Sequence, residues 1–120
     1  MSAYGSGTIV AYPLDDALAV GEGRTVVRGL SNSDSFCLDA AGNLYLGTRY
    51  GLRVGPPDGS QTKLIRIPGG SSSTGTTNCS FGGTDGRTLY ITSFHALYRV
   101  ENIPIPGLDW VVNRRRQRCP

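Results

Sequence analysis

Three cysteines carry the most reactive side chains in this sequence: Cys37, Cys79 and Cys119. They lie far apart, and none belongs to a Cys-x-x-Cys pair or to a Cys/His spacing typical of a metal site. Three cysteines with such spacing do not indicate a disulfide framework. We therefore interpret Cys37 and Cys79 as buried free thiols, which pack as small apolar side chains.

Two oxygen-bearing side chains are candidates for a site. Asp34 lies between Ser33 and Ser35, and on residue types alone a carboxylate in this setting is typical of a turn. Asn78 by itself indicates a structural hydrogen bond. The single histidine, His95, has no candidate partners for a catalytic triad beside it. We therefore expect it at the surface or packed against neighbouring side chains. Residue types alone therefore predict no catalytic centre.

The segments that position these residues have the pattern of short β-strands. With 17 Gly and 7 Pro in 120 residues, the composition excludes a coiled coil and a collagen and favours a turn-rich β protein. Apolar and β-branched runs alternate with turn residues. We expect strands at 8–12, 24–28, 35–39, 44–48, 52–54, 63–67, 89–92 and 97–100. A helical pattern is confined to 16–23, where Gly21 and Gly23 weaken it.

The strands repeat along the chain. Leu-Tyr-Leu at 44–46 recurs as Leu-Tyr-Ile at 89–91, and the strand at 52–54 recurs at 97–100. A period of about 40–50 residues with four short strands is the pattern of a β-propeller blade. A closed propeller has about 4–8 blades. We therefore predict an all-β fold, an incomplete β-propeller of about two to two and a half four-stranded blades.

Two motifs give the sequence a family resemblance over about residues 5–106. The stretch 33–45 resembles the "P-D-G-[LM]-C-[LI]-D-x-x-G-N-L-[WY]" motif of the gluconolactonase and senescence-marker-protein (regucalcin-like) family. The stretch 76–83, followed by 89–92, is similar to that family's "T-T-N-C-x-F-G-G…L-Y-[IV]-T" segment. The match falls on the last third of the family. It implies a six-bladed propeller with a divalent metal, usually calcium, and hydrolysis of sugar lactones.

The resemblance also implies roles for single residues. It makes Asp34 a metal ligand and the general base, facing the central channel from the innermost strand of a blade. It places Asn78 beside the channel, as a candidate substrate-binding residue. The family's Glu and Asn metal ligands have no counterpart in this chain. The glycine of the family's Pro-Asp-Gly is replaced by Ser35, which would be strained if that position needs a positive φ.

The charge of the chain is concentrated at its end. The formal net charge is +3, yet four of the last seven residues are arginine. We predict a partial propeller at 5–106 and a basic tail at 107–120. A short basic tail without interleaved aromatic residues is usually a solvated end. We therefore expect no nucleic-acid partner.

The sequence also bears on the cellular setting. The apolar runs are far shorter than the about 20 residues of a membrane span, and the opening residues lack the pattern of a secretory signal. We expect no membrane partner and a cytoplasmic location. There the thiols would stay reduced.

Three functional hypotheses remain open, and with them the question of whether the chain is an enzyme. The first is a fragment or truncated relative of a calcium-dependent sugar-lactone hydrolase, inactive as a monomer. The second is a non-catalytic propeller module for interactions. The third is a homo-oligomer that closes a ring. In each case we expect self-association or another chain that supplies missing blades, because open blade faces favour association.

Overall fold

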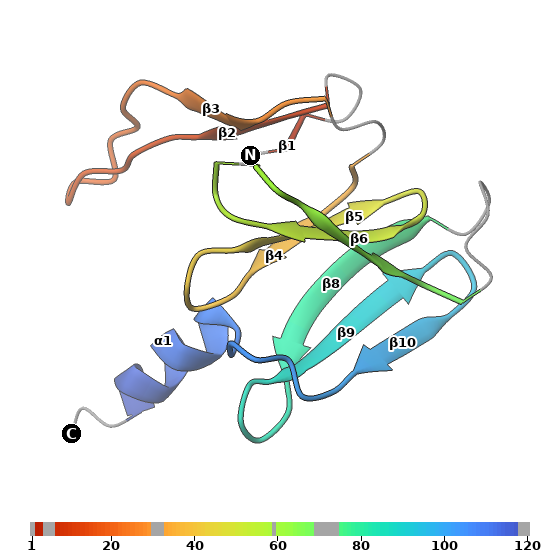
Figure 1. The fold of residues 1–120 in the computed structure, drawn as a ribbon. Helices are drawn as coiled ribbons and strands as arrows, with labels where there is room; N and C mark the ends of the chain where they lie inside the picture. Colours follow the sequence, from red (N-terminus) through yellow and green to blue (C-terminus); the bar gives the residue numbers. More distant parts are fainter. Residues whose placement is uncertain (1, 4–6, 30–32, 59, 69–74, 118–120) are drawn as a thin grey trace.

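The computed structural model describes residues 2–3, 7–29, 33–58, 60–68 and 75–117. Over these residues, ten β-strands form three antiparallel sheets, and one helix follows near the end of the described chain (Figure 1). The all-β prediction is confirmed. The sheets contain three, four and three strands, which is the architecture of an incomplete propeller.

The first sheet contains β1 (Ser2–Ala3), β2 (Thr8–Ala11) and β3 (Arg24–Val27), in that order. A long hairpin joins β2 to β3, and residues 16–23 form no helix there. Asp15 is the physical reason, because its Oδ1 accepts the backbone N–H groups of Ala17 at 2.9 Å and Ala19 at 2.8 Å. Such short-range acceptance favours a turn over a helix.

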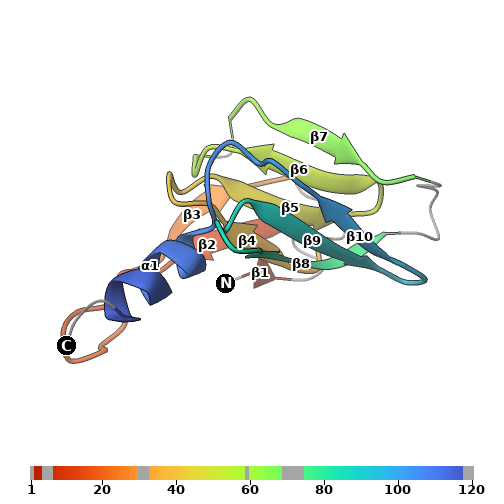
Figure 2. The same cartoon turned by 90° about the horizontal axis from the view of Figure 1, so that it is seen from below.

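The second sheet is the complete blade. Its strands are β4 (Phe36–Leu38), β5 (Leu44–Thr48), β6 (Gly51–Gly55) and β7 (Lys63–Arg66), ordered as they occur in the chain. Figure 2 shows β7 at the outer edge and β4 on the inner side. All five residues of β5 are buried. Because side chains of a strand alternate between the two faces of a sheet, both faces of this blade must be covered.

The third sheet contains β8 (Thr76–Gly82), β9 (Thr88–Ser93) and β10 (Leu97–Val100), with β9 in the centre. It repeats the first three strands of the second sheet, as the 45-residue spacing of the sequence predicts. Leu89 and Ile91 of β9 are buried, whereas Tyr90 between them is exposed. One face of this sheet therefore packs inward, and the other faces outward.

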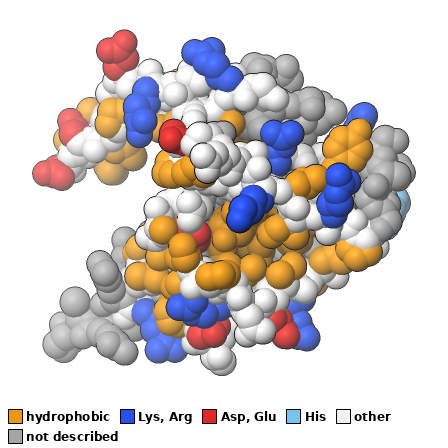
Figure 3. All heavy atoms as spheres, in the orientation of Figure 1, with side chains coloured by type: hydrophobic (Ala, Val, Ile, Leu, Met, Phe, Trp, Pro, Cys, Tyr) orange, Lys and Arg blue, Asp and Glu red, His pale blue; other side chains and the backbone are white. Residues whose placement is uncertain are grey.

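Two apolar clusters hold the sheets together face to face. Leu44 and Leu46 of β5 pack with Ile9 and Val27 of the first sheet. Figure 3 shows the surface hollowed between the first sheet and the rest of the molecule. An open pocket of about 280 Å³ lies there, lined by residues of β2, β3, β4 and β5.

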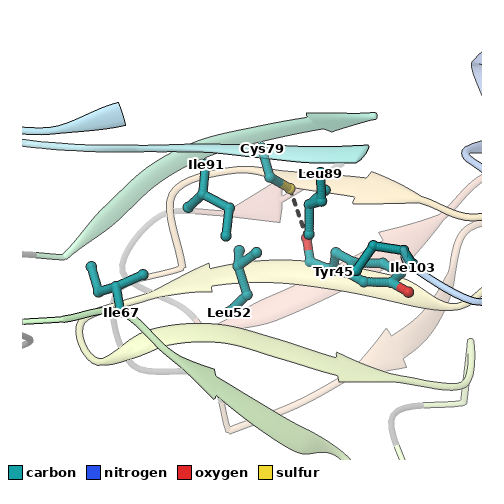
Figure 4. Packing of buried hydrophobic residues seen from close by; sticks show 7 residues of the cluster. All are labelled: Tyr45, Leu52, Ile67, Cys79, Leu89, Ile91 and Ile103. Carbon is teal, nitrogen blue, oxygen red and sulfur yellow. Dashed lines mark hydrogen bonds between the residues drawn. The ribbon is translucent and has the colours of Figure 1, made fainter. Parts of the chain in front are cut away.

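The larger cluster lies between the second and third sheets. It consists of Tyr45, Leu52, Ile67, Cys79, Leu89, Ile91 and Ile103 (Figure 4). Tyr45 points into this cluster, opposite to Leu44 and Leu46, as strand alternation requires. Stacking of neighbouring sheets on both faces of a central one is how propeller blades bury their apolar surface.

The segment after the third sheet contains α1 (Leu108–Gln117), within the stretch that the sequence predicts as a basic tail. The ring of Trp110 packs on Gly86, where an added Cβ would lie 2.5 Å from ring atoms. Arg114 lies over the Trp110 ring at 4.8 Å and donates a hydrogen bond to the carbonyl oxygen of Thr84. These contacts hold a short helix that its sequence pattern does not reveal. Within the described chain, no helix is long and apolar enough to cross a membrane.

Candidate functional site

Asp34 lies on the segment that leads directly into β4, the innermost strand of the complete blade. Its side chain is exposed, whereas the neighbouring Ser33 is 2% exposed. A buried residue thus anchors the chain immediately before a carboxylate that faces solvent. Asp34 thus precedes an inner strand, as the family resemblance implies, and its role as a ligand or base stays a prediction.

Ser35 connects this segment to the next blade. Its hydroxyl donates a hydrogen bond to Asn78 Oδ1 at 2.7 Å. The same oxygen accepts the backbone N–H of Cys79 at 2.7 Å. The structure therefore links Asn78, the third residue of β8, to the residue that follows Asp34. Asn78 makes the structural hydrogen bond that residue types indicate, and its contact with a substrate stays a prediction.

The serine in place of the family's glycine causes no backbone strain. Among the described residues, the non-glycine positions with positive φ are Leu18, Gln61 and Asn102, and Ser35 is not one of them. The replacement adds a hydroxyl that forms the bridge to Asn78. Sequence reasoning missed this role. The feature of the sequence that could have indicated it is Ser35 in place of the glycine of the family motif.

Asp39 lies at the opposite end of β4 and belongs to the turn. Its Oδ1 accepts the N–H groups of Ala41 at 2.9 Å and Asn43 at 3.0 Å, and its Oδ2 accepts the Asn43 side-chain amide at 2.8 Å. The residue is fully buried. The hydroxyl of Tyr45 approaches the same carboxylate at 3.5 Å. Burial, followed by the charge of Asp39, raises the pKa of Tyr45 to about 12.

The described residues do not by themselves fit a calcium site. In this part of the chain, no three His, Cys, Asp or Glu side chains lie together as potential metal ligands. Calcium takes six to eight oxygen ligands. Asp34 would supply one carboxylate, and the family's Glu and Asn ligands have no counterpart in this sequence.

The two cysteines predicted as free thiols are free, and they are neighbours. Cys37 of β4 is half-buried and Cys79 of β8 is buried. Their Sγ atoms lie 2.7 Å apart, and Cys79 Sγ also donates to the carbonyl oxygen of Tyr45 at 3.3 Å. The spacing of 42 residues between Cys37 and Cys79 did not indicate this contact. The third cysteine, Cys119, lies outside the described residues. His95 is exposed beside Phe94.

The arrangement matches known proteins. Residues 5–95 match the family described as SMP-30/Gluconolactonase/LRE-like region. The chain belongs to this family. Regucalcin of Xenopus laevis is 35% identical over 63 residues, which are 50% of this chain and 20% of that protein. The family resemblance predicted from the motifs is confirmed.

Two solved structures are similar to this chain in fold. The X-ray structure of a protein assigned as a gluconolactonase is 28% identical, with a TM-score of 0.68, and the match covers 87% of this chain and 34% of that one. A luciferin-regenerating enzyme is 19% identical with a TM-score of 0.68, and the match covers 41% of its chain. The present chain therefore spans 34% and 41% of the lengths of these two solved chains. The incomplete-propeller prediction is confirmed.

Proposed function

We propose that this chain is part of a calcium-dependent sugar-lactone hydrolase, with Asp34 as metal ligand and general base. The observation that carries the proposal is the position of Asp34, two residues before β4 and next to the Ser35–Asn78 hydrogen bond. The chain that holds it belongs to the SMP-30/gluconolactonase family. An exposed carboxylate there can accept a proton from a water that attacks a lactone carbonyl. Asn78, which is hydrogen-bonded to the residue that follows Asp34, would contact the same substrate.

The chain would not act alone. A ring that closes a channel needs more blades than the three sheets described. The outward faces carry apolar side chains such as Tyr90 and Leu97, which is 66% exposed. We propose self-association, or another chain that supplies missing blades and metal ligands. About three copies would provide the blades of one ring, and the monomer would be inactive.

The proposal also covers the partners, the cellular location and the substrate of the chain. Arg114 contacts Trp110 and Thr84, and we propose no nucleic-acid partner for the chain. We place the chain in the cytoplasm, where free thiols such as Cys37 and Cys79 stay reduced. A sugar lactone or a similar ester is the proposed substrate.

The direct test follows acid release from a sugar lactone. The full chain is incubated with D-glucono-lactone over a calcium titration, while light scattering follows the mass of the assembly. We expect turnover that needs calcium, appears with an assembly of about three times the chain mass and is lost in Asp34→Asn. Asp16→Asn, an exposed aspartate in the β2–β3 hairpin, is the matched control and should keep full activity.

The competing hypothesis is a non-catalytic interaction module, and the exposed apolar side chains of the third sheet, such as Leu97, favour it. It predicts no turnover at any calcium concentration, in either the monomer or the assembly. Equal activity in Asp34→Asn and Asp16→Asn would also contradict the role of Asp34. A defined trimer without turnover would support ring closure and reject catalysis.

A further inference from the structure

We propose that Cys37 and Cys79 form a reversible disulfide that ties β4 to β8 when the chain meets a small peroxide. The proposal does not depend on lactone hydrolysis. It rests on two thiols from neighbouring sheets whose Sγ atoms lie 2.7 Å apart. A disulfide bond is about 2.05 Å long and needs side chains that already face each other.

The surrounding structure holds the two strands in register for this bond. Two residues before Cys37, the Ser35 hydroxyl bridges to Asn78, which directly precedes Cys79. On the other side, the N–H of Gly47 donates to the carbonyl oxygen of Ser35 at 2.8 Å. Cys79 Sγ is hydrogen-bonded to Tyr45, the β5 residue paired with Cys37 (Figure 4). The thiols therefore meet through fixed backbone, not through a mobile loop.

A small oxidant can reach the pair. Both cysteines line a pocket of about 250 Å³ between β4, β8 and the start of α1, which also includes Phe81 and Asp109. A water molecule occupies about 30 Å³ in the liquid, so hydrogen peroxide fits this space. Cys79 is 7% exposed, which disfavours bulky oxidants.

The protonation of the pair suits a reactive thiol beside a resolving thiol. The hydrogen bond from Cys37 lowers the pKa of Cys79, against the effect of burial. The same hydrogen bond, then burial and the charges of Cys79, Asp109 and Asp39, raises the pKa of Cys37. These two directions favour the thiolate at Cys79 over the thiolate at Cys37. Oxidation of such thiols proceeds through a sulfenic acid that a neighbouring cysteine converts to a disulfide.

The reaction balances with peroxide as the oxidant. The Cys79 thiolate attacks one oxygen of hydrogen peroxide, the O–O bond breaks, and hydroxide leaves and takes up a proton to become water. Cys79 is now a sulfenic acid. Cys37 Sγ attacks the Cys79 sulfur, its thiol proton goes to the departing hydroxyl, and a second water leaves. Two thiols and one peroxide give one disulfide and two waters.

Mass spectrometry of the full chain is the test. The folded protein is treated with one equivalent of hydrogen peroxide and digested without reduction. We expect the loss of two hydrogen atoms, a peptide that links Cys37 to Cys79, and complete reversal by dithiothreitol. Stable sulfinic acid at either residue without a link, or a link to Cys119 in comparable yield, would overturn the proposal. Both thiols still open to alkylation after treatment would do the same.

Two comparisons show that the fold directs the bond. Cys119→Ser is the matched control and should give the same linked peptide in the same yield. The wild-type chain in urea should lose its preference for the Cys37–Cys79 pair, and an equal preference in urea would contradict direction by the fold. In Cys37→Ser, the Cys79 sulfenic acid should persist and react with dimedone once the treated chain is unfolded in urea. If that variant does not fold, the wild-type experiment still decides.

The disulfide should also stabilise the fold. A bridge between residues this far apart in the chain restricts the unfolded state strongly. We expect the thermal midpoint of the oxidised chain to rise by roughly 10 °C over the reduced chain. An oxidised chain with an unchanged or lower midpoint would show that the bond distorts the two strands, which contradicts a pair already held in register.

Discussion

Ser35 and Asn78 join the innermost strands of two neighbouring sheets through a single 2.7 Å hydrogen bond. The bond lies two residues from the Cys37–Cys79 contact and one residue from Asp34. The segment that carries the candidate catalytic carboxylate is thus tied to the next blade. Four predictions test how this hydrogen bond, a buried turn, a buried tyrosine and the stacking of the sheets contribute to stability.

The first prediction concerns the bridge itself. We expect Ser35→Ala to lower the free energy of unfolding by about 0.5–1 kcal/mol, because it removes one partly exposed hydrogen bond. Asn78→Ala should cost about 1–2 kcal/mol, because it also leaves the N–H of Cys79 without its acceptor. Urea unfolding of both variants and of the double variant measures the coupling. Additive losses would show that the two side chains act independently.

The second prediction concerns the buried turn at Asp39. Asp39→Ala should lower the free energy of unfolding by about 2–4 kcal/mol, because it leaves the N–H groups of Ala41 and Asn43 unpaired. Asp85→Ala is the control, since Asp85 is exposed and accepts the N–H of Arg87. It should cost about 1 kcal/mol or less. Similar losses in both variants would contradict a special role for the buried carboxylate.

The third prediction concerns alkaline pH. The pKa of Tyr45 is about 12 in the folded chain, above the value of about 10 of a solvated tyrosine. Folding therefore favours the neutral phenol of Tyr45. This preference stabilises the folded chain fully below about pH 10, and the stabilisation is lost as the pH rises towards 12. Urea unfolding at several pH values should show a loss of about 1–2 kcal/mol across this window.

Tyr45→Phe should flatten that part of the pH profile, because it removes the titrating group. Tyr50→Phe is the control, since Tyr50 is 51% exposed, and its profile should follow that of the wild type. A profile of Tyr45→Phe as steep as that of the wild type would assign the alkaline loss to other groups.

The fourth prediction tests the stacking of the sheets. Gly47 lies in the buried strand β5, and an added Cβ would meet the carbonyl oxygen and the hydroxyl of Thr76 at 3.0 Å. We expect Gly47→Ala to lower the thermal midpoint through a clash of about 1–3 kcal/mol between the second and third sheets. Gly75→Ala is the control, because its Cβ would meet its nearest atom at 3.5 Å, an ordinary contact. Equal midpoints in the two variants would mean that the sheets adjust freely.

The sequence was sufficient for the fold class and for the position of Asp34. The 45-residue repeat of the Leu-Tyr strands is a local pattern, and it indicates blades without any knowledge of contacts. The motif around Asp34 is contiguous, so its place before an inner strand can be read along the chain. The helix at 108–117 could not be read in this way, because Trp110 is held by Gly86 from a different segment.

What the sequence by itself determined is therefore eight of the ten strands among the described residues, their period, the family and the carboxylate just before β4; β1 and β8 were not predicted. What only the tertiary structure decided is which side chains meet between the sheets: Ser35 with Asn78, and Cys37 with Cys79. The physical reason is that strand alternation is a property of neighbouring residues, whereas the register between two stacked sheets is set by the packing of their shared core. That register is visible only when the sheets lie against each other.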